Sequence, residues 1–185
     1  MKIYLETERL ILREFTDADV DNLVELDADP EVTRYINGGK PTAREYIVET
    51  VMPKILSYYQ KGGNLGIWAV QKKDDPTFMG WFLLRPNLKD TSEIELGYRF
   101  KRKYWGQGFA TEGSVALVKK GFEELDIDVI MAAADPANGA SRRVMEKVGL
   151  IYEKDEAEED GFIIVKYHLD KAAYFNSKQA TQSSN

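Results

Sequence analysis

The sequence of 185 residues contains no cysteine and only one histidine, His168. Without cysteine the chain forms neither a disulfide framework nor a thiolate zinc site, and thiol catalysis is excluded. A Ser-His-Asp hydrolase would have to use His168, and the sequence has no Gly-x-Ser-x-Gly elbow to present the serine. We therefore expect neither thiol catalysis nor a catalytic triad of this kind, and we expect His168 to be structural or exposed.

Long hydrophobic runs are also missing. No apolar segment approaches the ~20 residues that span a bilayer. The first residues, MKIYLETERLILREF, alternate charged with hydrophobic side chains and do not form a signal-peptide core. We therefore expect a cytoplasmic protein with no membrane partner. The formal net charge of −6 disfavours binding to a nucleic-acid backbone and suits a cationic or amine-bearing partner.

The chain does contain enough apolar material for one globular core. Hydrophobic residues make up 43% of the sequence and aromatic residues 11%, which suits a single domain of this length. The last residues, NSKQATQSSN, lack apolar positions. We therefore expect one domain over residues 1–175 and a disordered tail over residues 176–185. Both a monomer and a homodimer are compatible with these features.

In the first half of the chain, hydrophobic periodicity predicts a strand, two helices and a hairpin. Residues 4–15 alternate as a strand does, and residues 16–29 have helical spacing up to Pro30, which ends the helix. A second helix is expected over about 42–62, with a break or kink near its internal proline. Residues 66–86 then read as an antiparallel hairpin around the turn DDPT.

The second half predicts one crossover followed by a hairpin. Residues 93–135 read as a β-loop-α-β unit, whose helix spans about 110–125. A short helix ends at Gly149, and residues 150–169 form a last hairpin. The order of these elements predicts a three-layer α/β (α+β) domain.

The loop WGQGFAT, residues 105–111, precedes the helix of the crossover. Gly106 and Gly108 would let backbone N–H groups approach an anion, and the dipole of the helix would add a favourable potential. A Walker A loop requires a lysine and then Ser or Thr after its last glycine, whereas Gly113 is followed by the letters SV. The loop is therefore not an ATP-binding loop of that type.

Other interpretations of this loop stay open on the residues alone. A dinucleotide fingerprint would need glycine where the chain has Thr111, although Asp135 at the end of the next strand resembles the expected ribose ligand. A plain strand-to-helix turn would bind nothing. Four positive charges within residues 99–103 favour a phosphate site, because a polyanion would offset their mutual repulsion.

Three segments, in the right order, resemble the GNAT superfamily of N-acetyltransferases, in the Rim-type branch that includes ribosomal-protein N-terminal acetyltransferases. EIELGYRF resembles the strand before that family's loop, and NGASRRVMEKVGL resembles its Asn-x-x-Ser segment. WGQGFA resembles its loop pattern, Gln/Arg-x-x-Gly-x-Gly/Ala, with Trp105 in place of Gln or Arg. The resemblance covers residues 6–169 and implies a mixed, mostly antiparallel sheet of about seven strands with helices on both faces.

The resemblance also implies acetyl-coenzyme A as co-substrate. Backbone groups of Tyr98, Arg99 and Phe100 would pair with its pantetheine arm, and Asn138 and Ser141 would reach the arm from the other side. The loop and first helical turn would hold the pyrophosphate, through Gly106, Gln107, Gly108, Phe109, Ala110 and Thr111. Read alone, Asn138 would be a turn former and Ser141 a helix N-cap.

The chemistry of amine acetylation narrows the candidate catalytic residues. Amine attack on a thioester needs a free amine, a polarised carbonyl and a proton for the leaving thiolate. The reaction needs neither a metal nor an enzyme nucleophile, so we expect no metal site and direct transfer in a ternary complex. Glu95, or alternatively Glu93, would take the amine proton through water; a solvated strand face is the competing interpretation. The resemblance implies that Met145 stands where many relatives have a tyrosine that acts as the general acid. We therefore expect Ser141 to donate a hydrogen bond to the thiolate instead.

The expected function is an N-acetyltransferase acting on a primary amine, which would be a protein N-terminus, such as that of a ribosomal protein, or a small molecule. The competing function is a non-catalytic acyl-coenzyme A binding or sensing module that kept the loop and lost the tyrosine. The acidic run at 155–160 would attract a cationic acceptor or form a solvated hairpin tip. Tyr35, Trp81 and the pair Tyr58 and Tyr59 would line an acceptor pocket or belong to the core.

Overall fold

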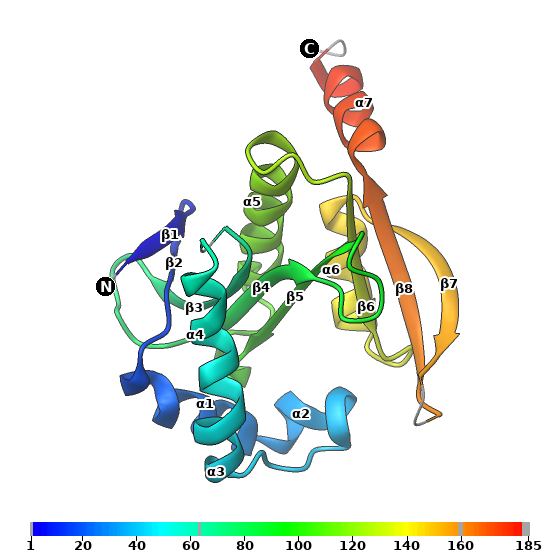
Figure 1. Cartoon of the computed structure of the whole chain (residues 1–185). Helices are drawn as coiled ribbons and strands as arrows, with labels where there is room; N and C mark the ends of the chain where they lie inside the picture. The colour runs from blue at the N-terminus through cyan, green and yellow to red at the C-terminus, as the bar shows by residue number, and fades with distance from the viewer. Residues whose placement is uncertain (1, 63, 159–160, 183–185) are drawn as a thin grey trace.

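The computed structural model describes residues 2–62, 64–158 and 161–182. Its centre is a sheet of eight strands in the order β1-β2-β3-β4-β5-β6-β8-β7 (Figure 1). Neighbouring strands are antiparallel except β5 and β6, which are parallel. The predicted three-layer α/β fold with a mostly antiparallel sheet is confirmed, and the sheet has eight strands where about seven were expected.

The extra strand comes from the first segment. β1 (Ile3–Glu6) and β2 (Leu10–Arg13) are antiparallel, and the Thr7 amide donates to the Leu10 carbonyl at 3.0 Å in the turn between them. The prediction of one continuous strand over 4–15 is therefore wrong. The turn contains neither glycine nor proline, so the alternation of apolar and polar side chains runs through it without a visible break.

Helices at the N-terminal end cover one face of the sheet. α1 (Val20–Ala28) follows a 3-10 turn, and α3 (Arg44–Tyr46) continues through a π-helical stretch (Ile47–Val51) into α4 (Met52–Gln60). The sequence pattern missed α2 (Pro30–Asn37). Pro30 ends α1 as predicted but also begins α2, where the missing N–H of proline costs nothing because that position has no intrahelical partner. These helices bury a core that includes Phe15, Leu23, Leu26, Ile47, Met52, Ile55 and Phe78.

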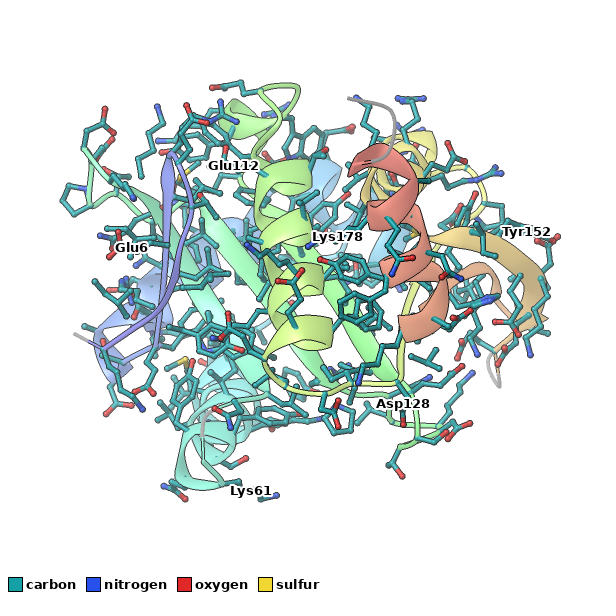
Figure 2. All side chains as sticks on the ribbon, turned by 90° about the horizontal axis from the view of Figure 1, so that it is seen from above. Glu6, Lys61, Glu112, Asp128, Tyr152 and Lys178 are labelled. Carbon is teal, nitrogen blue, oxygen red and sulfur yellow. The ribbon has the colours of Figure 1, made fainter. Side chains whose placement is uncertain are left out.

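The centre of the chain supplies the middle of the sheet and the other helical layer. β3 (Gly66–Lys72) and β4 (Gly80–Pro86) form the predicted hairpin. β5 (Ile94–Phe100), α5 (Phe109–Glu123) and β6 (Val129–Ala134) form the predicted crossover, and α6 (Gly139–Val148) follows. In Figure 2, α5 lies in front of the sheet and α4 behind it. The larger core packs under α5 and α6 and includes Leu10, Trp68, Phe82, Leu117, Phe122, Ile130, Met145 and Tyr167.

The C-terminal end departs from the expected disorder. β7 (Ile151–Ala157) and β8 (Ile163–Asp170) form the predicted hairpin, and α7 (Lys171–Gln182) follows β8 directly (Figure 1). The prediction of a disordered tail from residue 176 is therefore wrong for 176–182, and residues 183–185 lie outside the described residues. The Tyr174 ring packs 4.9 Å from the Phe122 ring, and its hydroxyl donates to Glu123. Tyr174 lies before the polar segment 176–185. The composition of that segment alone therefore does not reveal the helix.

Within the described ranges, no helix is long and apolar enough to cross a membrane. The cytoplasmic location expected from the sequence stays a prediction.

Candidate active site

β5 and β6 are paired only near the start of β5. Two register pairs join them, Ile94 with Ile130 and Glu95 with Met131. Seven pairs join β5 to β4 on its other side, so β5 itself is regular along its whole length. Beyond Glu95 the two parallel strands part, and a cavity of about 460 Å³ opens between them.

Five parts of the chain wall this cavity: the end of β5, the loop and first turn of α5, the end of β6, α6, and α2. The cavity brings together most of the residues that the sequence predicted for the cofactor, namely Tyr98, Arg99, Phe100, Gly106, Gly108, Phe109, Ala110, Thr111, Asn138 and Ser141. Gln107, Glu93 and Glu95 do not line it. The missed helix α2 contributes Glu31, Val32, Tyr35 and Ile36.

The open edge of β5 presents backbone groups to the cavity. The Lys101 amide donates to the Met79 carbonyl at 2.8 Å, on the β4 side of the strand. Backbone groups of successive residues point to opposite sides of an antiparallel strand, so those of Phe100 and Tyr98 point toward β6. The backbone of Arg99 points toward β4, and only its side chain can reach the cavity. Of the three residues predicted to pair with pantetheine, two therefore have their main chain in position.

The loop before α5 adopts a backbone that glycine alone accepts readily. Gly106 has φ 72° and Gly108 has φ 83°, both left-handed. Gly108 is the N-cap of α5, and no side chain caps the helix. The N–H groups of the first turn, at residues 109–111, are therefore free of a side-chain acceptor and sit at the positive end of the helix dipole.

Arg9, which the sequence reasoning did not single out, holds this loop in place. Its Nε lies 2.6 Å from Glu112 Oε2, its Nη1 donates to the Gln107 carbonyl at 3.1 Å, and its guanidinium lies 4.4 Å from the Phe109 ring centre. Partial burial would raise the pKa of Glu112, but hydrogen bonds from Thr7 and Arg9 outweigh it and hold that pKa below its usual value. The β1-β2 turn thus anchors α5, and no local signal marks a contact across about a hundred residues.

Two side chains of the loop are used within the loop itself. Gln107 Nε2 donates to the Lys103 carbonyl at 2.8 Å, so this side chain does not enter the cavity. Trp105 stands where the family pattern has Gln or Arg, and its Nε1 donates to the Phe100 carbonyl at 2.8 Å. Trp105 thus ties the loop to the end of β5, and it occupies the acceptor atom that Phe100 would have offered to a ligand.

α6 brings two polar residues to the opposite wall. Asn138 is its N-cap, and the Asn138 side-chain oxygen accepts from the Ser141 amide at 3.1 Å. The N-cap role considered for Ser141 is therefore filled by Asn138, whose side-chain nitrogen is left to donate toward the cavity. Met145 is buried in the core under α6.

The Ser141 hydroxyl lies 3.3 Å from the Tyr98 hydroxyl. Burial raises the pKa of Tyr98, and the contact with Ser141 lowers it by a smaller amount. Tyr98 is therefore a protonated hydrogen-bond donor at neutral pH. The family resemblance implied a role only for the backbone of Tyr98, although the position of this residue beside the loop pattern was a signal that its side chain would also reach the site.

The two candidate bases face a second cavity, of about 360 Å³. Glu95 accepts from Arg85 Nη2 at 2.8 Å, and Glu93 accepts from Lys166 Nζ at 2.8 Å. Both carboxylates are thus ion-paired at the second cavity and do not line the main one. The two cavities adjoin, because Ala133 lines both of them.

The remaining sequence candidates divide between wall and core. Tyr35 lines the main cavity. Trp81 packs against the core under α1 to α4, and the Tyr59 hydroxyl accepts a hydrogen bond from the Phe15 amide at 3.0 Å, so both residues are structural. His168 lines neither cavity, and its Nδ1 lies 3.6 Å from Glu153 Oε2.

Comparison with known proteins agrees with this geometry. The model of a family described as "Acetyltransferase (GNAT) domain" matches residues 9–151. The chain belongs to the GNAT acetyltransferase family. It is 33% identical over 157 residues to the uncharacterized protein YkkB of Bacillus subtilis, covering 83% of this chain and 88% of that one. As the family assignment implies, the protein is an acetyl-CoA-dependent acetyltransferase.

Two further similarities bear on this GNAT protein. It is 31% identical to the FsC-acetyl coenzyme A-N(2)-transacetylase of Aspergillus fumigatus, over 80% of this chain and 65% of that one. A crystal structure of a GNAT-family acetyltransferase from Bacillus anthracis superposes with a TM-score of 0.73 at 25% identity, covering 93% of this chain and 99% of that one. The Rim-type branch is only weakly indicated, because the RimL structure is 17% identical and shows the fold alone.

Within the part of the chain that the structure describes, no group of three or more His, Asp or Glu side chains could hold a metal ion. The residues of the main cavity do suit coenzyme A. They offer an unpaired strand edge for an amide-rich arm, a helix N-terminus for a pyrophosphate, and side-chain donors on α6.

Proposed function

We propose that this GNAT protein moves the acetyl group of acetyl-coenzyme A directly to a primary amine within a ternary complex. The observation that carries the proposal is the parting of β5 and β6 just beyond the pair Glu95 and Met131. An arm lying along the open edge of β5 would end its path at this vertex. There a thioester would lie next to both cavities.

The cofactor's path follows from the donors and acceptors along the cavity. Pantetheine would pair with the backbone of Tyr98 and with the amide of Phe100, whose carbonyl is taken by Trp105, and Asn138 would donate from the opposite wall. The pyrophosphate would receive hydrogen bonds from the amides of residues 109–111, where the helix dipole favours an anion. Gly108 has no side chain to obstruct this approach, and Arg9 keeps the loop in register.

Glu95 is the proposed proton acceptor, acting through water. It belongs to the last register pair before the strands part, so its carboxylate is on the residue closest to the vertex on β5. Arg85 forms an ion pair with the Glu95 carboxylate and so competes with direct binding of an amine there. Proton transfer through a water molecule avoids this competition. Glu93, paired with Lys166, is the alternative acceptor.

The leaving thiolate needs a proton donor on the other side of the vertex. Ser141 remains the proposed donor. Tyr98 would assist it, because a buried phenol that stays protonated can supply the proton through the serine hydroxyl or directly. In the reaction the amine nitrogen bonds to the acetyl carbon and the carbon–sulfur bond breaks. The amine then loses a proton toward Glu95, and the sulfur gains one from the hydroxyl pair.

The acceptor is proposed as a primary amine at a peptide N-terminus or on a small molecule. Tyr35 and Ile36 of α2 are partly exposed at the wall of the main cavity and would contact its apolar part. Glu156 and Glu158 line the second cavity, where they would attract an ammonium group, although Lys89 pairs with Glu158 at 2.7 Å. The A. fumigatus relative named as an N(2)-transacetylase supports an amine acceptor of this general kind.

The deciding experiment measures thiol release from acetyl-coenzyme A against a panel of amines, which includes peptides with different N-termini, polyamines and amino acids. Acetylated product identified by mass spectrometry supports the proposal. Tight binding of coenzyme A without release for any amine would favour the sensing module instead. A thermal shift with NAD and none with coenzyme A would reject both functions.

A further inference from the structure

Two basic side chains on α6 line the main cavity without a carboxylate partner. Arg143 and Lys147 lie four residues apart on the helix, and both border the cavity. Neither forms an ion pair with any carboxylate of the described residues. By contrast, the nearby cations Arg99 and Arg102 are neutralised by Asp27 and Asp29.

This arrangement is unfavourable in the free protein. Like charges at positions i and i+4 of a helix repel each other. A bound anion would offset this repulsion, and in a chain of net charge −6 two cations without a carboxylate partner stand out. The cavity lining holds two carboxylates, Asp135 and Glu31. Asp135 accepts the Ala137 amide at 2.7 Å, and Glu31 lies 3.7 Å from Arg34, so neither neutralises the α6 pair.

We propose that Arg143 and Lys147 form the subsite for the 3′-phosphate of coenzyme A. This inference rests on the proposed function, because it takes coenzyme A as the occupant of the cavity. The pyrophosphate is already provided for by the amides at residues 109–111. The phosphate monoester on the ribose is the remaining anion, and it carries about two negative charges at neutral pH. Two exposed cations at the cavity wall match that charge.

The subsite makes the enzyme selective for coenzyme A over 3′-dephospho-coenzyme A. Charge-assisted bonds between a guanidinium and a phosphate are among the stronger hydrogen bonds, but both side chains are exposed at the wall, where water screens them. We therefore expect the wild-type protein to bind coenzyme A about tenfold more tightly than the dephospho form. The preference should shrink as the salt concentration rises.

Isothermal titration calorimetry with these two ligands tests the proposal. In the double variant Arg143→Gln with Lys147→Gln, the affinity for coenzyme A should fall to that for 3′-dephospho-coenzyme A, while the affinity for the dephospho form changes by less than about twofold. Arg143→Lys should keep part of the preference. The matched control is Lys54→Gln with Lys61→Gln, which removes two charges from α4 and its end, on the opposite face of the sheet, and should keep the full preference.

Three outcomes would overturn the assignment. Equal affinity of the wild-type protein for both ligands would mean that the 3′-phosphate is not recognised. An equal loss of affinity for both ligands in the α6 variant would place these cations at the pyrophosphate or the adenine. Absence of coenzyme A binding by the wild-type protein would reject the proposed function as well. Thermal unfolding of each variant confirms that the exposed substitutions leave the fold intact.

Discussion

The hydroxyl of Tyr98 on β5 lies 3.3 Å from the hydroxyl of Ser141 on α6, so the two walls of the main cavity meet in a hydrogen bond. The Tyr98 ring also packs against Phe82 and Phe100, which holds the phenol in one position. The resemblance to the family implies a tyrosine that acts as an acid at the position where this chain has Met145. We propose that Tyr98, which comes from a strand and not from the helix, takes this role instead.

Tyr98→Phe should lower turnover by about tenfold to a hundredfold, within the usual contribution of a proton donor. Affinity for acetyl-coenzyme A should change little, because the backbone of residue 98 is unaltered. Steady-state thiol release and calorimetry separate the two effects. Tyr104→Phe, at another tyrosine of the cavity wall, serves as the control and should leave turnover near that of the wild type. Normal turnover in Tyr98→Phe together with a loss in Ser141→Ala would assign the proton to Ser141 alone.

Gly108→Val should weaken acetyl-coenzyme A binding severely. A side chain at φ 83° is strained, and a Cβ there would lie 3.5 Å from Arg9 Nη2, at the approach to the helix amides. Calorimetry on the folded variant measures the loss. Gly161→Val is the matched control, because residue 161 has a similar φ of 85° and no described atom lies within 4 Å of its Cβ position. If the two variants bind acetyl-coenzyme A with the same affinity, the loop is not the pyrophosphate site.

Glu112→Gln should raise the KM for acetyl-coenzyme A more than it lowers kcat. The change weakens the ion pair with Arg9 and the hydrogen bond from Thr7, and both contacts fix the first turn of α5. Loss of order there affects ground-state binding and the transition state alike. Glu123→Gln, near the other end of α5, breaks a comparable surface contact with Lys178 and should leave KM unchanged. A pure kcat defect in Glu112→Gln would contradict the positioning role of the pair.

Glu95→Gln should lower turnover at pH 7 by about tenfold to a hundredfold if the acceptor is an α-amine. An α-amine has a pKa of roughly 7.7–8.0, so raising the pH deprotonates it and should restore much of the loss. A pH profile of kcat from 6 to 9 measures this, and Glu93→Gln, at the alternative acceptor, is measured in parallel. Full activity of Glu95→Gln across the range would remove this residue from the mechanism. A loss that high pH does not rescue would mean that Glu95 positions the acceptor.

Asp19→Asn should destabilise the protein at pH 7 by about 3 kcal/mol, because it leaves Arg13 largely buried without a counter-charge. Burial would raise the pKa of Asp19, but hydrogen bonds from Arg13 and Thr16 outweigh it and lower that pKa below its usual value. The stabilisation is therefore present above the unfolded-state pKa of about 3.9 and is lost as the pH falls through the lower folded value.

Urea unfolding of Asp19→Asn and the wild type at pH 7 and at pH 3 measures this dependence. The difference between them should narrow at the lower pH. Asp17→Asn, an exposed neighbour, is the control and should change stability little at either pH. A constant difference across the range would show that the Asp19 charge is not the source of the stabilisation.

Local signals in the sequence predicted the elements whose determinants are local. Glycines with a left-handed backbone mark the loop at 105–111, the start of α5 and the end of α6 at Gly149. Their backbone conformation is a local property, so the sequence reveals it. α2 was missed because Pro30 reads as a helix end, although proline also starts helices. The helical continuation of the chain beyond Asn176 was missed because its polar letters hide the upstream anchor at Tyr174.

Periodicity and a motif that is contiguous in the chain predicted the family, the layer architecture and most residues of the main cavity, because these features depend on residues close together in the sequence. Which side chains meet across the cavity depends on the tertiary structure. Arg9 and Glu112 are separated by 103 residues, and Tyr98 and Ser141 by 43. The strand order and the parting of β5 from β6 bring these pairs together and turn Glu95 toward a neighbouring cavity. No spacing rule predicts such contacts, because they depend on packing between elements and not on the sequence within one.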